Sequence, residues 1–121
     1  ILIAIVIALS GVYYLNNRHE QQKWQKSGEL TKDTLMFFRR KYPGFTKKTD
    51  IYFVNTPVKY ENVWVFPTGL ADGLWFIYRD SMPQFYQYDT VEDAMAAANK
   101  KNNMDSHIFE FTDDGKLQEA R

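Results

Sequence analysis

The chain has 121 residues, no net charge and no cysteine. Without cysteine, it has no disulfide bond, thiolate nucleophile or cysteine-ligated zinc site. Residues 1–61 carry ten Lys and Arg against five Asp and Glu, whereas residues 62–121 carry five against ten. A nucleic-acid-binding domain is usually basic overall, so we expect no nucleic acid as a partner.

The chain begins with an uncharged, strongly apolar run, Ile1–Leu15. A helix crosses a bilayer with about 20 apolar residues, and the aromatic and basic residues at the end of this run suit the membrane interface. The sequence therefore predicts a transmembrane helix over residues 1–17. The residues expected to contact lipid are Ile1, Leu2, Ile3, Ile5, Val6, Ile7, Leu9, Val12, Tyr13 and Tyr14.

Two other interpretations of this run are a cleaved signal peptide and a buried core helix. No small-residue cleavage site follows the run, which argues against a signal peptide. The run is short for a span and does not begin with Met. We therefore expect further residues to precede Ile1 in the natural polypeptide.

Residues 18–44 are predicted to form an amphipathic helix that continues from the apolar run. The apolar stripe is expected at Trp24, Thr31, Leu35, Phe38 and Tyr42, with charged residues between them. A bend or break is expected at Ser27-Gly28, and Pro43-Gly44 ends the helix. The neighbouring Phe37 and Phe38 are expected to cover the domain's own sheet; docking to a partner is the alternative.

The clearest strand is predicted at residues 50–56. Its continuous β-prone run, Ile51–Val54, is typical of a strand that is buried on both faces. Ligands in open α/β sheets tend to lie beyond the carboxyl ends of strands. Asn55 is therefore a candidate binding residue, and the alternative is that its amide caps a turn.

Residues 61–67 are predicted to form an extended segment that stops at Pro67. Thr68 is then expected to cap a short helix that runs from Gly69 to about Tyr78. The aromatic run 74–78 would also suit a strand, so both interpretations stay open.

The last third of the chain alternates between strand and helix patterns. Residues 84–88 read as a strand, and residues 91–101 as a helix whose capping box is formed by Thr90 and Asp93. Residues 106–112 alternate like a strand, and Asp114-Gly115 predicts a hairpin turn with a returning strand at 116–119.

These elements predict an α/β fold. We expect the N-terminal transmembrane helix (1–17), the amphipathic stem helix (18–44), and a small soluble α/β domain (45–121). The domain should hold a small mixed, partly parallel sheet with two short helices and a C-terminal β-hairpin, because strands alternate with helices until the final turn.

No catalytic constellation is present in the sequence. His19 and His107 have no second ligand at metal spacing, and the acidic pairs Glu92-Asp93 and Asp113-Asp114 suit helix capping and turn formation. No phosphate-binding or nucleophile-elbow motif occurs. We therefore expect no metal, cofactor or catalytic residue, and whether the chain is an enzyme stays open.

The order of motifs resembles the C-terminal extracytoplasmic domain, with the last transmembrane helix, of polytopic bacterial membrane proteins similar to dolichyl-phosphate-mannose-type (GT-C-like) glycosyltransferases. The residues that carry this resemblance are the apolar run, Trp24 and Leu35, Ile51–Asn55 with Pro57, Val65-Phe66 with Gly69-Leu70, Ile108–Phe111, and Asp114–Leu117. In such enzymes the catalytic carboxylate lies in an early extracytoplasmic loop, so the resemblance implies a non-catalytic domain here.

The resemblance implies a membrane-anchored domain on the extracytoplasmic side, although the basic residues after the run would favour the cytoplasmic side. Expected partners are membrane lipid, proteins bound through the transmembrane helix, and a glycan or lipid-linked sugar. The candidate binding surface consists of Asn55, Tyr60, Trp64 and Trp75.

Two alternatives remain. The first is a pilin-like structural subunit of a filament, since an apolar helix followed by a strand-rich head is the layout of type IV pilins. Against this alternative, Ile5 occupies the position where a mature pilin usually has Glu. The second alternative is an accessory single-span subunit of a larger membrane complex.

Overall fold

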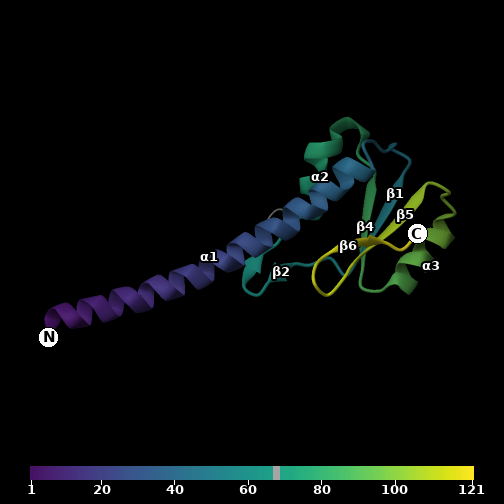
Figure 1. The fold of residues 1–121 in the computed structure, drawn as a ribbon. Coiled ribbons are helices and arrows are strands. Elements are labelled where there is room, and N and C mark those ends of the chain that lie inside the picture. The colour runs from purple at the N-terminus through teal and green to yellow at the C-terminus, as the bar shows by residue number, and fades with distance from the viewer. Residues whose placement is uncertain (67–68) are drawn as a thin grey trace.

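The computed structural model describes residues 1–66 and 69–121 and consists of one long helix and a small α/β head (Figure 1). We use "head" for residues 45–121 together with the part of the helix that packs on them. The elements are α1 (Leu2–Lys41), β1 (Asp50–Val54), β2 (Lys59–Tyr60), β3 (Val63–Trp64), α2 (Leu70–Tyr78), the 3₁₀ turn η1 (Arg79–Ser81), β4 (Gln84–Tyr88), α3 (Val91–Lys101), β5 (Ser106–Phe111) and β6 (Leu117–Glu119).

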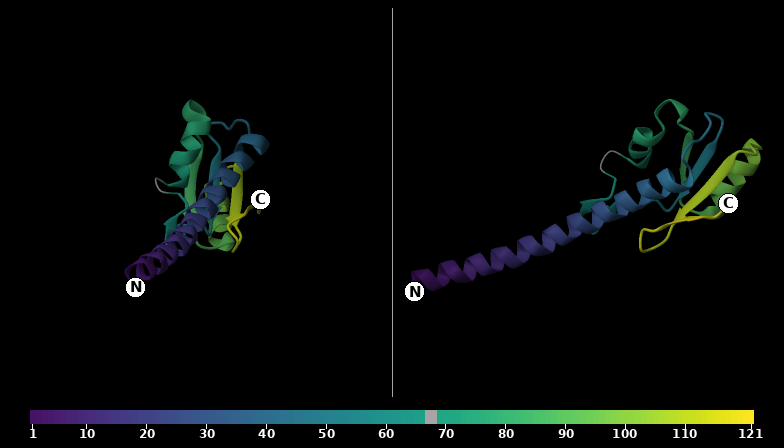
Figure 2. Two further views of the ribbon diagram at one scale, coloured as in Figure 1. Left: turned by 60° about the vertical axis from the view of Figure 1, so that its left-hand side comes forward. Right: turned by 45° about the horizontal axis from the view of Figure 1, so that its top comes forward.

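Helix α1 is continuous, and its N-terminal half projects away from the head in every view (Figures 1 and 2). The break considered at Ser27-Gly28 does not occur. Ser27 is buried there, and its hydroxyl donates to the Trp64 carbonyl oxygen at 2.6 Å. Contact with the head therefore supports the helix at this point, as is usual for helices in proteins.

The buried stripe of α1 differs from the predicted one. Its members are spaced three and four residues apart, as one helix face requires, and they are Ser27, Leu30, Thr34 and Phe38. The prediction was right for Phe38, and Leu35 and Tyr42 pack partly against the core. It was wrong for Trp24, whose side chain is 62% exposed.

The four-stranded sheet has the order β4-β1-β5-β6. β1 pairs in parallel with β4 and β5, and β6 pairs antiparallel with β5. All five residues of β1 are buried, which confirms the strand predicted to be covered on both faces. The mixed, partly parallel α/β sheet is therefore confirmed.

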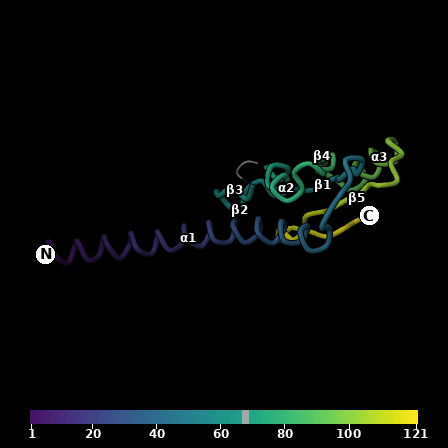
Figure 3. Tube along the Cα trace, turned by 90° about the horizontal axis from the view of Figure 1, so that it is seen from above, coloured from purple at the N-terminus to yellow at the C-terminus, as the bar shows by residue number. Residues whose placement is uncertain are grey.

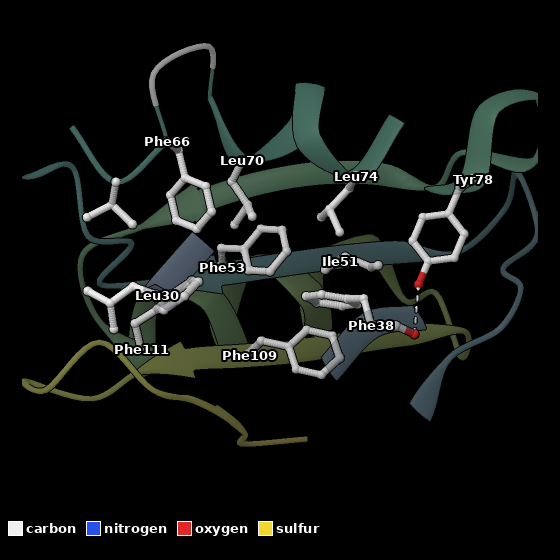
Figure 4. Packing of buried hydrophobic residues seen from close by; sticks show 11 residues of the cluster. Leu30, Phe38, Ile51, Phe53, Phe66, Leu70, Leu74, Tyr78, Phe109 and Phe111 are labelled. Atoms are coloured by element: carbon white, nitrogen blue, oxygen red, sulfur yellow. Dashed lines mark hydrogen bonds between the residues drawn. The ribbon is translucent and has the colours of Figure 1, made fainter. Parts of the chain in front are cut away.

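The two faces of β1 pack against different helices. Ile51 and Phe53 face the core formed with α1 and α2, whereas Tyr52 and Val54 face α3. This alternation follows from the two-residue period of a strand. Figure 4 shows the larger core, in which Phe38 of α1 lies among residues of the sheet and α2.

The aromatic run 74–78 is helical. Leu70, Leu74 and Tyr78 are the buried face of α2. The Tyr78 hydroxyl lies within hydrogen-bond distance of the Phe38 carbonyl oxygen at 3.3 Å (Figure 4) and donates to the Tyr42 carbonyl oxygen at 2.7 Å. The cap expected at Thr68 and the stop expected at Pro67 lie outside the described residues.

Local signals in the last third of the chain are confirmed. The Thr90 hydroxyl accepts from the Asp93 backbone N–H at 3.2 Å and begins α3. Gly115 has a φ of 78° in the β5–β6 turn. A Cβ at this position would lie 2.8 Å from a Leu30 methyl carbon, so both the backbone conformation and the packing on α1 require glycine.

The segment predicted as a single extended stretch at 61–67 is part of a hairpin. β2 pairs antiparallel with β3 in a sheet separate from the main one. Glu61 adopts a φ of 53° in the turn between them. The hairpin lies beside α1, on the part of the head nearest the projecting half of the helix (Figure 3).

The last strand is joined to the end of α1 through Glu119. Its carboxylate accepts hydrogen bonds from Lys41 Nζ at 2.6 Å and from the Tyr42 hydroxyl at 2.5 Å. These donors, Lys41 first, lower the pKa of Glu119 to about 2. The ionised carboxylate therefore stabilises the folded state.

We expect acid to weaken this contact. Because the folded pKa lies below the ordinary value of about 4.3, the stabilisation is complete above that pH and is lost as the pH falls toward about 2. Glu119→Gln should lower the free energy of unfolding at pH 6 and flatten its decline below about pH 4.5. Urea unfolding across this range measures both effects. Glu92→Gln, at an exposed carboxylate on α3, should keep the wild-type dependence of the free energy of unfolding on pH. The same wild-type pH dependence in Glu119→Gln would contradict the prediction.

Candidate functional site

The predicted lipid-facing residues lie on the projecting half of α1 or, for Ile1, at its N-terminal cap. Their side chains are between 49% and 104% exposed; they are Ile1, Leu2, Ile3, Ile5, Val6, Ile7, Leu9, Val12, Tyr13 and Tyr14. A contiguous apolar surface of this extent marks an interaction site. Within the described part of the chain, no helix combines the length and the apolar character that crossing a membrane requires.

A second site lies at the carboxyl ends of the parallel strands β1 and β5. This carboxyl-edge pocket has a volume of about 240 Å³, and it is lined by Leu30, Asn55, Pro57, Lys59, Tyr60, Thr112, Asp113, Asp114 and Gly115. It forms because the β2–β3 hairpin folds back beside the turn that follows β5. The structure thus brings together two predicted residues, Asn55 and Tyr60, at the edge where α/β sheets usually bind ligands.

Asn55 has a structural role at this edge. Its backbone φ is 54°, and its side-chain amide donates to the Phe111 carbonyl oxygen at 3.1 Å. Its backbone N–H donates to the Tyr88 carbonyl oxygen at 3.2 Å. The residue therefore joins the ends of three strands, because its amide bonds to the end of β5 rather than to its own turn.

The acidic side of the pocket is suited to hydrogen bonding rather than to proton transfer. The Thr112 hydroxyl donates to the Asp114 carboxylate, and Lys116 Nζ lies 3.0 Å from that carboxylate. The hydrogen bond from Thr112, followed by that from Lys116, lowers the pKa of Asp114 to about 2. Asp114 is thus ionised at neutral pH and is a poor general acid.

An apolar groove runs along the other side of the hairpin. This tryptophan groove has a volume of about 500 Å³, and it is lined by Trp24, Ser27, Gly28, Thr31, Lys32, Leu35, Met36, Trp64 and Val65. Gly28 and Ser27 leave room for it because their side chains are absent or small. Trp24 was predicted to be buried, so the sequence did not indicate this groove.

The four residues of the predicted binding surface do not form one surface. Lys59 pairs with Trp64 and Tyr60 pairs with Val63 in the hairpin, so Tyr60 and Trp64 lie on opposite faces. Trp75 lies on α2 in edge contact with Phe76, at 5.4 Å between ring centroids. It lines neither the carboxyl-edge pocket nor the tryptophan groove.

A cluster at the opposite end of the sheet joins β1, β4 and α3. Lys101 Nζ donates to Asp50 at 2.6 Å and to the Tyr86 hydroxyl at 2.7 Å. The bond to the Asp50 carboxylate raises the pKa of Lys101. A lysine held in its protonated form is not a nucleophile, so this cluster is structural.

No family model, curated protein or solved structure matches this chain. No group of His, Cys, Asp or Glu residues suited to a metal ion occurs within residues 1–66 and 69–121. Function is therefore inferred from the exposed helix, the pocket and the groove.

Proposed function

We propose that this chain is a membrane-anchored interaction domain without a catalytic site of its own, and that α1 inserts its apolar end into a lipid bilayer. The observation that carries the proposal is the division of one continuous helix into two parts. Residues 1–19 are exposed throughout, whereas Phe38 in the same helix is fully buried in the head. The helix is thus fixed at one end and offers its other end to an apolar surrounding.

The dimensions and chemistry of the exposed end support insertion into lipid. Fifteen residues rise about 22 Å, which places most of them within a hydrocarbon layer of about 30 Å. Tyr13 and Tyr14 follow at the depth where aromatic rings favour the interface. The Arg18 guanidinium lies 5.9 Å from the Tyr14 ring centroid, so its cationic group can sit at headgroup level.

The sequence resemblance supports a narrower form of this proposal. It implies an extracytoplasmic domain that belongs with a glycosyltransferase-like membrane protein and presents or binds a glycan or lipid-linked sugar. The carboxyl-edge pocket offers such a ligand an aromatic ring from Tyr60 and hydrogen-bonding groups from Asp113 and Asp114. These features suit a polar, hydroxylated ligand.

Insertion is tested by flotation of the full chain with phosphatidylcholine–phosphatidylglycerol vesicles. Ile7→Lys should reduce vesicle binding about 100-fold, because a lysine at the centre of a membrane helix costs about 3 kcal/mol. Gln22→Lys adds the same charge at an exposed, polar position of α1 and should bind at least as well as the wild type, because a lysine beside the membrane surface is attracted to anionic lipid. Undiminished flotation of Ile7→Lys would refute insertion.

A pilin-like filament subunit is the second candidate, because pilins also divide one long helix between an apolar half and a half packed on a sheet. The parallel pairing of β1 with β4 and β5 differs from the plain antiparallel sheet expected of a pilin head. Electron microscopy of the purified chain without lipid distinguishes the two. Filaments would favour the pilin-like function, whereas dispersed particles that insert into vesicles favour the membrane-anchored domain.

A further inference from the structure

The end of the head that faces the apolar helix is formed by the β2–β3 hairpin and the neighbouring turns of α1. Glu61 in the hairpin turn lies 3.2 Å from Lys23 Nζ, and the Trp64 carbonyl oxygen accepts from Ser27 at 2.6 Å. Figures 1 and 3 show the hairpin as the part of the head closest to the projecting half of α1. We call this end, residues 23–27 and 59–64, the near end.

The near end is a short, fixed distance from the apolar run. Lys23 follows Leu15 by eight residues in one unbroken helix, a rise of about 12 Å. The headgroup layer of one leaflet is about 5–8 Å thick, and helices that cross bilayers tilt by about 20° on average. Insertion of Ile1–Leu15 would therefore bring the near end to the bilayer surface.

The exposed side chains of the near end suit a lipid interface. Trp24 is 62% exposed, Trp64 is 49% exposed and Tyr60 is 36% exposed; such amphipathic rings are enriched at headgroup level. In a helix, Trp24 leans toward the N-terminus, and here that direction leads to the bilayer. Lys59 Nζ lies 4.4 Å from the Trp64 ring centroid. The hairpin therefore presents an ammonium group that can bind a lipid phosphate and, beside it, an aromatic ring.

The charges near these rings do not oppose contact with anionic lipid. Glu20 lies 2.9 Å from Lys23 Nζ, and Glu61 lies 3.2 Å from the same ammonium. Glu29 lies 4.0 Å from Lys26. The two lysines offset two of these three negative charges, and Arg18 and Lys59 add two positive charges, so this group of side chains is net positive and suits an anionic lipid surface.

We infer that Trp24 and the β2–β3 hairpin rest on the headgroup layer of the bilayer into which α1 inserts, so that the head is held against the membrane. This inference rests on the proposed membrane insertion. The partner is the phospholipid surface. Because Lys59 and Tyr60 of the near end also line the carboxyl-edge pocket, this contact would hold that pocket close to the bilayer surface.

The three tryptophans provide the test. Gly73 on α2 packs against Leu35, with a Cβ position 3.3 Å from a Leu35 methyl carbon, and Leu35 follows Leu15 by about 30 Å along α1. Trp75 on α2 is therefore a control far from the near end. All three rings are at least 48% exposed, so Phe replacements should preserve the fold.

The experiment uses three full-chain variants that each retain one tryptophan: W64F/W75F, W24F/W75F and W24F/W64F. Each is floated with phosphatidylcholine–phosphatidylglycerol vesicles that carry a headgroup-level nitroxide quencher. We expect Trp24 and Trp64 fluorescence to be quenched roughly threefold more than Trp75 fluorescence, because only the first two lie at the interface.

The outcomes separate this inference from the proposed function. Vesicle binding with equal quenching of all three tryptophans would overturn the contact between the near end and the headgroup layer and leave membrane insertion intact. A second copy that covered Trp24 and Trp64 would shield them from the quencher and would also overturn it. Failure of every variant and of the wild type to float would refute insertion itself, and with it the contact between the near end and the headgroup layer.

Discussion

Phe38→Ala is expected to destabilise the head by about 3–5 kcal/mol, the usual cost of removing a fully buried phenylalanine. Phe38 is 0% exposed, and its ring meets Phe53 and Phe109 at centroid distances of 5.7 Å and 5.0 Å in edge-to-face geometry. Loss of the ring therefore removes both its buried area and these aromatic contacts. The packing around it is visible in Figure 4.

The same substitution tests whether α1 belongs to the folding unit of the head. Small domains are stable by about 5–15 kcal/mol in total, so the variant should be largely unfolded at moderate urea concentrations. Arg39→Ala, at the next and exposed position, should change stability by less than about 0.5 kcal/mol. Urea unfolding followed by near-ultraviolet circular dichroism measures both. A loss below about 1 kcal/mol for Phe38→Ala would mean that the sheet and α2 are stable without α1.

Features decided by neighbouring residues could be predicted from the sequence. The apolar run of β1, the cap at Thr90 and the turn at Asp114-Gly115 are each set within a few residues. The structure contains them: Thr90 caps α3, β1 is buried throughout, and β5 and β6 pair on either side of Gly115. Residue propensity and hydrophobic periodicity are enough to predict an element where its tertiary contacts agree with the local preferences of the chain.

Features decided by tertiary contacts could not be predicted in this way. Ser27 and Thr34 lay outside the predicted stripe, yet both are buried, and their hydroxyls donate to the carbonyl oxygens of Trp64 and Leu30. Burial of these small polar residues turns the helix so that Trp24 faces solvent. A buried hydroxyl with a hydrogen-bond partner costs little, and the partner of Ser27 lies 37 residues further along the chain, where a local pattern does not indicate it.

The candidate sites show the same limit. Asn55 was placed correctly at the carboxyl end of a strand, but its proximity to Tyr60 depends on the β2–β3 hairpin. That hairpin has two-residue strands and turns through Glu61 at positive φ, without the Asn-Gly or Asp-Gly pair that marks most tight hairpins. Both the carboxyl-edge pocket and the tryptophan groove depend on it, so neither could be predicted as a cavity.

Asp50→Ala is expected to destabilise the head by about 3 kcal/mol, because hydrogen bonds to a buried charged group contribute about 1.5–3 kcal/mol each. The Asp50 side chain is 2% exposed. It accepts from Lys101 Nζ at 2.6 Å and from Asn103 Nδ2 at 2.7 Å. One carboxylate thus holds the start of β1 to the end of α3 and to the loop that leads into β5.

Matched variants separate charge from hydrogen bonding at this position. Asp50→Asn keeps a side-chain oxygen for Lys101 and Asn103 but removes the charge, so its loss should be about half that of Asp50→Ala. Asp89→Ala removes an exposed carboxylate and should have an effect below about 0.5 kcal/mol. Urea unfolding at pH 7 gives the four free energies of unfolding.

A double-mutant cycle with Lys101→Met then measures the coupling between the two charges. Lys101→Met leaves Asp50 buried with the amide of Asn103 as its remaining donor among the contacts described above. A buried charge that has lost its partner is strongly destabilising. Adding Asp50→Leu to Lys101→Met should therefore recover part of the lost stability. Additive losses would show that the carboxylate is stabilised through Asn103 alone and that Lys101 contributes only as a solvated charge at the end of α3.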